Sequence, residues 1–433
     1  MKGTKRYGIT ALVGALIVIV VILIGVAAYA FAYPPTSVTT STVTSTATTT
    51  VSGTGTAVST VTTTVTTATA AQASALSKLK IGFILPLTPA DDSWNFNAYN
   101  AMQKLKSEYN FTLSTSENIA SGTDAAVPAG TWASQGYNVV VFMGGQYQQE
   151  ANTFAGQNPT IMSVCVDCTV ANYSNVYRIW LDLSGGGFVL GAMAGMVSQA
   201  HKFGLVGGGD IPSIWQGHEG FIAGVMYTSP VTPSITNTFE AFAWADVSGA
   251  QTSATNDYTA GADVVFSSGD GIDVGVLGAA MAQPSSPQVW ATNVYTNLTA
   301  IEPADNRILL GSIVIDYASP FFKAMLDYVS NNWHWGYTKV DMASGLEKVQ
   351  PGPNVPAKIA AAGLALQSDI VEGQIIISFA STTSGSPYCF VNTGSAYAST
   401  CGDTTLTVPS SGGTPTGNMA AQFNYLPPVS SLP

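Results

Sequence analysis

The stretch KLKIGFILPLTPADDSWNFNAYN, residues 78–100, decides the fold. It opens with an apolar run at 81–85, which has the length of a buried strand, and prolines end that run. The Asp-Asp-Ser triplet that follows offers N-cap chemistry for a helix beginning at Trp94. In an open α/β sheet, the loop after the first strand faces the ligand crevice. The alternative interpretation is that Trp94 packs in the core and the aspartates only cap the helix.

The same alternation of strand-like and helix-like segments continues to about residue 379. The predicted strands are 81–85, 137–143, 160–166, 203–206, 264–266, 288–292 and 308–315. The predicted helices are 94–109, 187–199, 218–226, 272–282, 320–331 and 356–368. Such alternation indicates βαβ units and a parallel sheet. Because about 300 residues exceed one ordinary core, we predict an α/β protein with two Rossmann-like lobes and a central cleft.

The charge of the chain narrows the classes of partner. Only 9% of the 433 residues are charged, and the net charge is −11 with a pI near 4.5. An acidic chain of this kind is not expected to bind nucleic acid. The 46% of hydrophobic residues is ample for a large core.

The N-terminal segment has the pattern of a membrane span. Lys2, Lys5 and Arg6 precede an uninterrupted apolar run at about 9–32, and a span needs roughly 20 such residues. Basic residues on its N-terminal side predict that the rest of the chain lies outside the cytoplasm. We therefore expect residues 1–35 to be a transmembrane anchor or a signal segment. The small-x-small sequence at 28–30 leaves cleavage open.

Two segments of biased composition flank the predicted lobes. Residues 36–77 are almost wholly Thr, Ser, Val, Ala and Gly up to about residue 75, which predicts a disordered, glycosylatable stalk. Alternating Thr and Val also have β propensity, so a strand there is the competing interpretation. Residues 380–433 are rich in Gly, Ser, Thr and Pro and form an irregular, Cys-containing C-terminal extension.

Four cysteines are candidates for disulfides, since an even number outside the cytoplasm favours them. They are Cys165, Cys168, Cys389 and Cys401, and local pairs are the simplest connectivity. A zinc site is the alternative, but only the first pair has ligand spacing. Glycosylation sequons occur at Asn110, Asn172 and Asn297.

Several ordered motifs together resemble one known family. They are DDSWN at 91–95, QGY at 135–137, Asp167, NV at 175–176, DLSGGGFVLGA at 182–192, KFGLVGGGDIP at 202–212, GFIAGV at 220–225, GADVVF at 261–266 and GDGIDVGV at 269–276. In this order they resemble the basic membrane protein family of ABC-transporter substrate-binding lipoproteins, which includes purine nucleoside receptors. The resemblance implies the type I periplasmic-binding-protein fold. The junction at 5–8 resembles the pilin-type leaders of archaeal binding proteins, which implies an archaeal, membrane-anchored form.

The resemblance also implies a set of ligand-binding residues. They are Asp91, Trp94, Asn95, Asp167, Gly269, Asp270, Gly271 and Asn293. Trp94 matches an aromatic residue that stacks on a base, and the glycines match the contact loop of the second lobe. Further aromatic candidates for the cleft are Trp215, Trp290 and Tyr295, and packing in the core is the favoured alternative for each. Two positions depart from the family pattern: Asn293 stands where an aspartate binds ribose, and a lysine is missing from 311–316. The predicted lobes are 78–200 with 288–318, and 201–287 with 319–379.

We therefore expect a solute receptor and not an enzyme. It binds a nucleoside-like small polar molecule outside the cell membrane, presents it to an ABC permease and uses no cofactor. The three histidines, His201, His218 and His334, have neither triad nor metal-ligand spacing. The alternative is a surface-exposed sensory or structural protein on the same fold.

Overall fold

The computed structural model describes residues 43–48, 60–65, 67–209, 211–239, 244–373, 375 and 377. The chain divides into two units, 1–73 and 74–433. In the first, β1 (Val43–Thr48) and β2 (Thr60–Val65) pair antiparallel. Both strands lie within the expected stalk, and the β propensity of Thr and Val is the physical reason for pairing.

Two predicted segments lie outside the described residues. They are the membrane segment at 1–35 and the C-terminal extension at 380–433, together with Cys389 and Cys401. Among the residues that are described, no helix is both long and apolar enough to cross a membrane.

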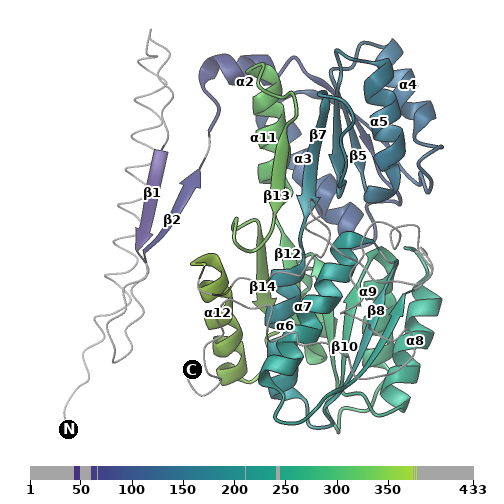
Figure 1. The fold of residues 1–433 in the computed structure, drawn as a ribbon, viewed down its shortest axis with the longest axis vertical. Coiled ribbons are helices and arrows are strands. Elements are labelled where there is room, and N and C mark those ends of the chain that lie inside the picture. Colours follow the sequence, from purple (N-terminus) through teal and green to yellow (C-terminus); the bar gives the residue numbers. More distant parts are fainter. Residues whose placement is uncertain are drawn as a thin grey trace, which may run out of the picture. The chain divides into compact units, whose positions relative to one another are not determined.

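The second unit contains two six-stranded sheets, each the core of one lobe (Figure 1). The first sheet has the order β13-β7-β6-β5-β3-β4, and all its strands are parallel. These strands are β3 (Lys80–Ile84), β4 (Thr112–Ser116), β5 (Val139–Met143), β6 (Met162–Val166), β7 (Val176–Leu181) and β13 (Tyr337–Val340).

The second sheet has the order β14-β12-β11-β10-β8-β9, and only its edge strand β14 is antiparallel. Its strands are β8 (Lys202–Gly207), β9 (Ser234–Phe239), β10 (Val264–Ser268), β11 (Trp290–Tyr295), β12 (Leu309–Ile315) and β14 (Glu347–Pro351). The buried strands are near-continuous apolar runs because helices cover both faces of each sheet.

The helices divide between the lobes. Those of the first lobe are α3 (Trp94–Tyr109), α4 (Ala126–Ser134), η1 (Gly145–Tyr147), α5 (Gln148–Gln157) and α11 (Ala318–Val329), whereas α2 (Ala70–Leu76) spans the boundary between the two units. Those of the second lobe are α6 (Ser184–Val197), α7 (Pro212–Thr228), α8 (Val247–Thr259), α9 (Asp270–Met281), α10 (Leu298–Ile301), η2 (Pro303–Arg307) and α12 (Ala357–Val371). Every strand and helix predicted from the sequence is present, with ends shifted by a few residues.

Successive side chains of a strand serve opposite faces of each sheet. Phe83 of β3 packs edge-on against Phe321 of α11, whereas the neighbouring Ile84 belongs to a cluster with α4 and α5. In the second sheet, Val265 packs with α8 and α9, and Phe266 contacts Phe221 of α7. The period of two along each strand thus builds two cores per lobe.

The assignment of segments to lobes differs from our expectation. β11 and β12, predicted to join the first lobe, belong to the second sheet. β13, predicted in the second lobe, belongs to the first sheet, and α6 packs on α7 in the second lobe. The chain therefore crosses between lobes three times, near Asp182, Asp316 and Asp341. Sequence periodicity says nothing about which of two similar sheets a strand joins.

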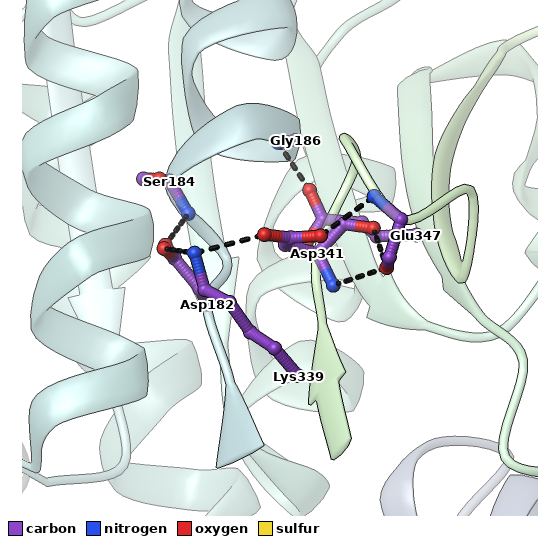
Figure 2. A network of polar contacts seen from close by, with 7 residues as sticks. Asp182, Ser184, Gly186, Lys339, Asp341 and Glu347 are labelled. Atoms are coloured by element: carbon purple, nitrogen blue, oxygen red, sulfur yellow. Dashed lines mark hydrogen bonds and ion pairs between the residues drawn. The ribbon is translucent and has the colours of Figure 1, made fainter. Parts of the chain in front are cut away.

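A polar network holds two of these crossings together, as Figure 2 shows. Lys339 of β13 pairs with Asp182 at 2.9 Å and with Asp341 at 2.8 Å. Burial lowers the pKa of Lys339, but the two aspartates raise it by more, so the ammonium stays charged. The backbone N–H of Asp182 donates to the carbonyl of Val340. These contacts tie the crossing segments to one another, and we call the linked segments the hinge.

Glu347, at the start of β14, is the buried acid of the same network. One of its oxygens accepts the N–H of Gly186 at the start of α6, as Figure 2 shows. Burial first, and then the charge of Asp182, raise its pKa well above the ordinary value. Glu347 therefore links β14 to the crossing that leads into α6.

Candidate functional site

Asp91 and Asn95 organise the loop between β3 and α3. The Asp91 carboxylate accepts hydrogen bonds from the backbone N–H groups of Asn95 at 3.0 Å and Phe96 at 2.8 Å, which caps α3. It also accepts one from the Asn95 side chain, at 2.6 Å. Both residues were predicted as ligand contacts, but neither lines the cavity between the lobes. For Asp91, the structure shows the alternative interpretation, in which the aspartate caps the helix.

Trp94 forms one wall of the interlobe cavity. Its indole N–H donates to the carbonyl of Met143 at 3.3 Å, which fixes the ring orientation. Its ring packs edge-on against Tyr295, with centroids 4.9 Å apart, and against Tyr317 at 5.5 Å. Since Tyr295 ends β11 of the other lobe, these aromatic rings meet across the cleft.

Asp167 follows β6 directly, at the carboxyl edge of the first sheet, in a left-handed conformation with φ of 59°. Its Oδ2 accepts a hydrogen bond of 2.6 Å from Ser213 of α7 in the second lobe. Its Oδ1 has no hydrogen-bond partner among the described residues. Asp167 is only 6% exposed and lines the cavity. Burial raises its pKa to about 7, and the Ser213 hydrogen bond lowers it in part.

The second lobe contributes the loop between β10 and α9. Gly269 has φ of 139°, a conformation that favours glycine. Gly269 and Asp270 both line the cavity. Gly271 lies behind them, where its N–H donates to the carbonyl of Trp244 at 2.7 Å, and Trp244 itself lines the cavity.

Several acidic residues lie on the second-lobe side of the cavity. Burial, then the charges of Asp91 and Asp273, raise the pKa of Asp270 well above its ordinary value. Burial raises the pKa of Asp273 to about 8, although Ser267 and Ser93 donate to it and lower that value in part. Basic side chains are not among the causes that shift the pKa of Asp167, Asp270 or Asp273.

Asn293 does not line the cavity. Its side-chain amide donates to the carbonyl of Thr296 at 3.0 Å and to the Thr296 hydroxyl at 3.1 Å. It therefore shapes the turn that follows β11. The Thr296 hydroxyl in turn donates to the carbonyl of Asp92 at 2.6 Å, across the cleft.

Sequence reasoning missed part of the cavity wall. The residues it did not select are Gly144, Gly145, Gln146, Ile211 and Trp244, whereas Tyr295 was an aromatic candidate. The first three follow β5, so the rule that ligands bind at the carboxyl ends of strands was a usable signal. Trp244 carried no such signal. The other aromatic candidates, Trp215 and Trp290, do not line this cavity.

The cavity is small because the two lobes are in contact. Its volume is about 30 Å³, roughly the space of one water-sized group. Direct hydrogen bonds close it: Ser93 to Asp273 at 3.1 Å, and Asn97 to the carbonyls of Tyr295 and Ile315 at 2.6 and 2.8 Å. An organic molecule therefore enters only when the lobes part.

A larger hollow, of about 470 Å³, lies on the second lobe beside the start of β10 and β11. Its one acid, Asp263, accepts hydrogen bonds from Ser198, Gln199 and Ala200. No unpartnered acid is among the described residues that line this hollow, and it lies at the amino ends of these strands. The interlobe cavity is therefore the better candidate site, although it is the smaller of the two.

Other predicted sites have mixed outcomes. Cys165 and Cys168 form a disulfide, with Cα atoms 5.7 Å apart. Asn110 and Asn172 are exposed, whereas the Asn297 side-chain oxygen is buried without a partner among the described residues. Within the described part of the chain, no group of three or more His, Cys, Asp and Glu residues could hold a metal ion.

Two lobes with mainly parallel sheets, three crossings and a lined interlobe cavity are consistent with the two-lobed periplasmic-binding-protein fold. A family profile described as "ABC transporter substrate-binding protein PnrA-like" matches residues 78–342. This chain belongs to that family, as its motifs predicted.

Relatives and solved structures agree with the assignment. The chain is 28% identical over 202 residues to a CD4+ T-cell-stimulating antigen of Listeria monocytogenes, covering 46% of this chain and 55% of the relative. It is 26% identical over 212 residues to an ABC transporter nucleoside-binding protein of Lactococcus lactis, covering 47% and 60%. The chain thus spans somewhat over half the length of these relatives.

The fold likeness extends to an ABC transporter solute-binding protein from Aeropyrum pernix. That structure has a TM-score of 0.58 at 17% identity, covering 69% of this chain and 93% of the other. A solute-binding protein from Conexibacter woesei has a TM-score of 0.54 at 19% identity, covering 68% and 97%. At these identities the structures establish the fold alone.

Proposed function

We propose that this chain is the receptor of an ABC importer, which binds a small polar molecule between its lobes and presents it to a permease. The observation that carries the proposal is the convergence of Trp94, Asp167 and Asp270 on one cavity from both lobes. Closure on a ligand is the usual motion of such folds. Nucleosides are the first class to test, because the Lactococcus lactis relative is named for binding them.

The apolar N-terminal segment supports a location of the two lobes on the outer side of the cell membrane. We propose that residues 1–35 hold the receptor at the cell membrane, with the lobes on the outer side, as basic residues before an apolar run favour. The exposed sequons at Asn110 and Asn172 are compatible with that side.

Isothermal titration calorimetry of the full chain with nucleosides, sugars and amines tests the proposal. Trp94→Ala removes a ring that lines the cavity, so we expect at least a tenfold loss of affinity, which is about 1.4 kcal/mol or more. Trp335→Ala is the matched control, because Trp335 is 62% exposed. Absence of binding to every class by the wild-type chain contradicts the receptor function.

A sensory or structural role on the same fold is the second candidate. One relative is the transcriptional activator protein Med of Bacillus subtilis. It is 26% identical over 199 residues, which cover 46% of this chain and 61% of the relative. A permease and an ATPase encoded beside this chain favour transport, whereas a neighbouring kinase or surface-layer gene favours the second candidate.

A further inference from the structure

The interlobe cavity has an excess of acid with no counter-charge among its lining residues. Asp167 and Asp270 line it, and Asp273 and Asp91 lie close enough to Asp270 to raise its pKa. Lysine, arginine and histidine are not among the described residues that line the cavity. Basic residues elsewhere have other partners: Lys339 pairs within the hinge, for example. Anions are therefore poor ligands for this site.

Asp167 shows where a ligand is needed. The residue is 94% buried, and its Oδ1 faces no hydrogen-bond donor among the described residues, although Oδ2 is held by Ser213. A buried carboxyl oxygen without a donor is costly, by about 1–3 kcal/mol. Burial of an unpaired carboxylate costs more and is relieved by a positive partner or by protonation.

The aromatic walls suit the same kind of partner. Trp94, Trp244 and Tyr295 line the cavity together with the two aspartates. Aromatic faces attract cations by about 0.5–2 kcal/mol, most strongly where water is excluded. A metal ion is disfavoured, because the described acids do not form a group that could hold one.

We propose that the ligand is a small organic cation, whose ammonium or amidinium nitrogen donates to Oδ1 of Asp167 and to Asp270 while its apolar body packs on Trp94 and Tyr295. This inference rests on the receptor function and narrows its ligand. The positive nitrogen supplies the counter-charge that the lining residues lack. The body of such a ligand occupies space that opens when the lobes part.

A matched pair of probes separates charge from shape. Tyramine carries an ammonium group where tyrosol carries a hydroxyl, and the two molecules are otherwise the same. Calorimetry of the full chain compares this pair with putrescine, adenosine, xylose and AMP. We expect at least one amine to bind at least tenfold more tightly than its neutral counterparts, and AMP not to bind. Neutral ligands that bind as well as the amines overturn the cation inference and leave the receptor function intact. Absence of binding by all probes overturns both.

Asp167→Asn keeps the shape of the side chain and removes its charge. We expect it to weaken amine binding at least tenfold and to leave any residual tyrosol binding within a factor of three. Asp369→Asn on α12, away from the cavity, is the matched control. An equal loss for amine and alcohol overturns the inference.

The wild-type chain provides a readout that does not depend on a variant folding. Tyr295 and Tyr317 lie close enough to Asp167 for its charge to raise their pKa values. Asp270 lines the same cavity, with Asp91 and Asp273 close to it. Since the pKa of Asp167 is about 7, amine affinity should rise about tenfold from pH 6 to pH 8. Amine affinity that is flat or falls over this range overturns the inference.

Discussion

Glu219 is a buried acid of α7 that takes no part in the cavity. It is 1% exposed, and neither carboxyl oxygen has a hydrogen-bond partner among the described residues. Burial raises its pKa from 4.5 to about 8. Below pH 4.5 the side chain is protonated in both the folded and the unfolded chain. Between those values only the unfolded chain ionises, so this residue lowers the free energy of unfolding as pH rises.

Glu219→Gln should therefore stabilise the protein, and more so at higher pH. We expect a gain of about 3 kcal/mol in the free energy of unfolding at pH 7 and of about 1 kcal/mol at pH 5. Urea unfolding at pH 5, 7 and 8 measures it. Glu302→Gln, at an exposed position, is the control and should show no such pH dependence. A variant no more stable than the wild-type chain at pH 8 contradicts the prediction.

The cavity residues that could be predicted from the sequence are those that come after a recognisable strand. Trp94, Asp167 and Gly269 follow strands that apolar runs reveal, so the carboxyl-edge rule found them. Asp91 and Asn95 have the same location, yet the Asp91 carboxylate bonds within its own loop, whereas the Asn95 side chain also hydrogen-bonds Asp270 of the second lobe. Which polar side chain turns towards the cavity depends on backbone dihedrals that residue types do not encode alone.

At the scale of elements, the contact between α6 and α7 depends on glycines. A Cβ at Gly191 would overlap the carbonyl oxygen of Phe221, and one at Gly224 would overlap that of Phe188. Close approach of two backbones leaves no room for a methyl group. These glycines stand in the family motifs, but the sequence does not tell which helix packs against which.

Gly191→Ala should therefore destabilise the second lobe by about 3 kcal/mol, because the obstructing atoms are backbone. Thermal unfolding followed by circular dichroism measures the loss. Gly130→Ala is the matched control: Gly130 lies in α4, and a Cβ there meets nothing within 4 Å. That variant should gain up to about 1 kcal/mol, from helix propensity and reduced unfolded-state entropy. Equal effects of the two substitutions contradict the argument.

The three crossings explain why the lobe boundaries could not be predicted from the sequence. Local periodicity reports whether a segment is a strand, and both sheets use the same apolar pattern. β11 pairs with β12, the next strand along the chain, whereas β13 pairs with β7, which lies far back in the sequence. Topology rules constrain how successive strands of one sheet are connected, but they do not say which of two sheets a strand joins.

At the scale of the whole molecule, closure is held by hydrogen bonds that need no ligand. Asn97 of α3 donates to the carbonyls of Tyr295 and Ile315, at the ends of β11 and β12. Asn97→Ala removes both hydrogen bonds and spares the residues that line the cavity. With a net value of about 0.5–1 kcal/mol for each bond, the closed population should fall. Because the cavity of this closed, ligand-free state is too small for an organic molecule, a larger share of the chain is then open to ligand.

Small-angle X-ray scattering of the ligand-free chain measures this opening directly, because separated lobes increase the radius of gyration. Asn256→Ala, on the exposed face of α8, is the control for loss of an amide and should leave the scattering curve unchanged. A saturating ligand should restore the wild-type radius in Asn97→Ala, since the ligand bridges the lobes. A larger radius that persists with bound ligand contradicts closure as the shared basis of binding. A radius equal to that of the wild-type chain shows instead that the hinge network sets the lobe angle.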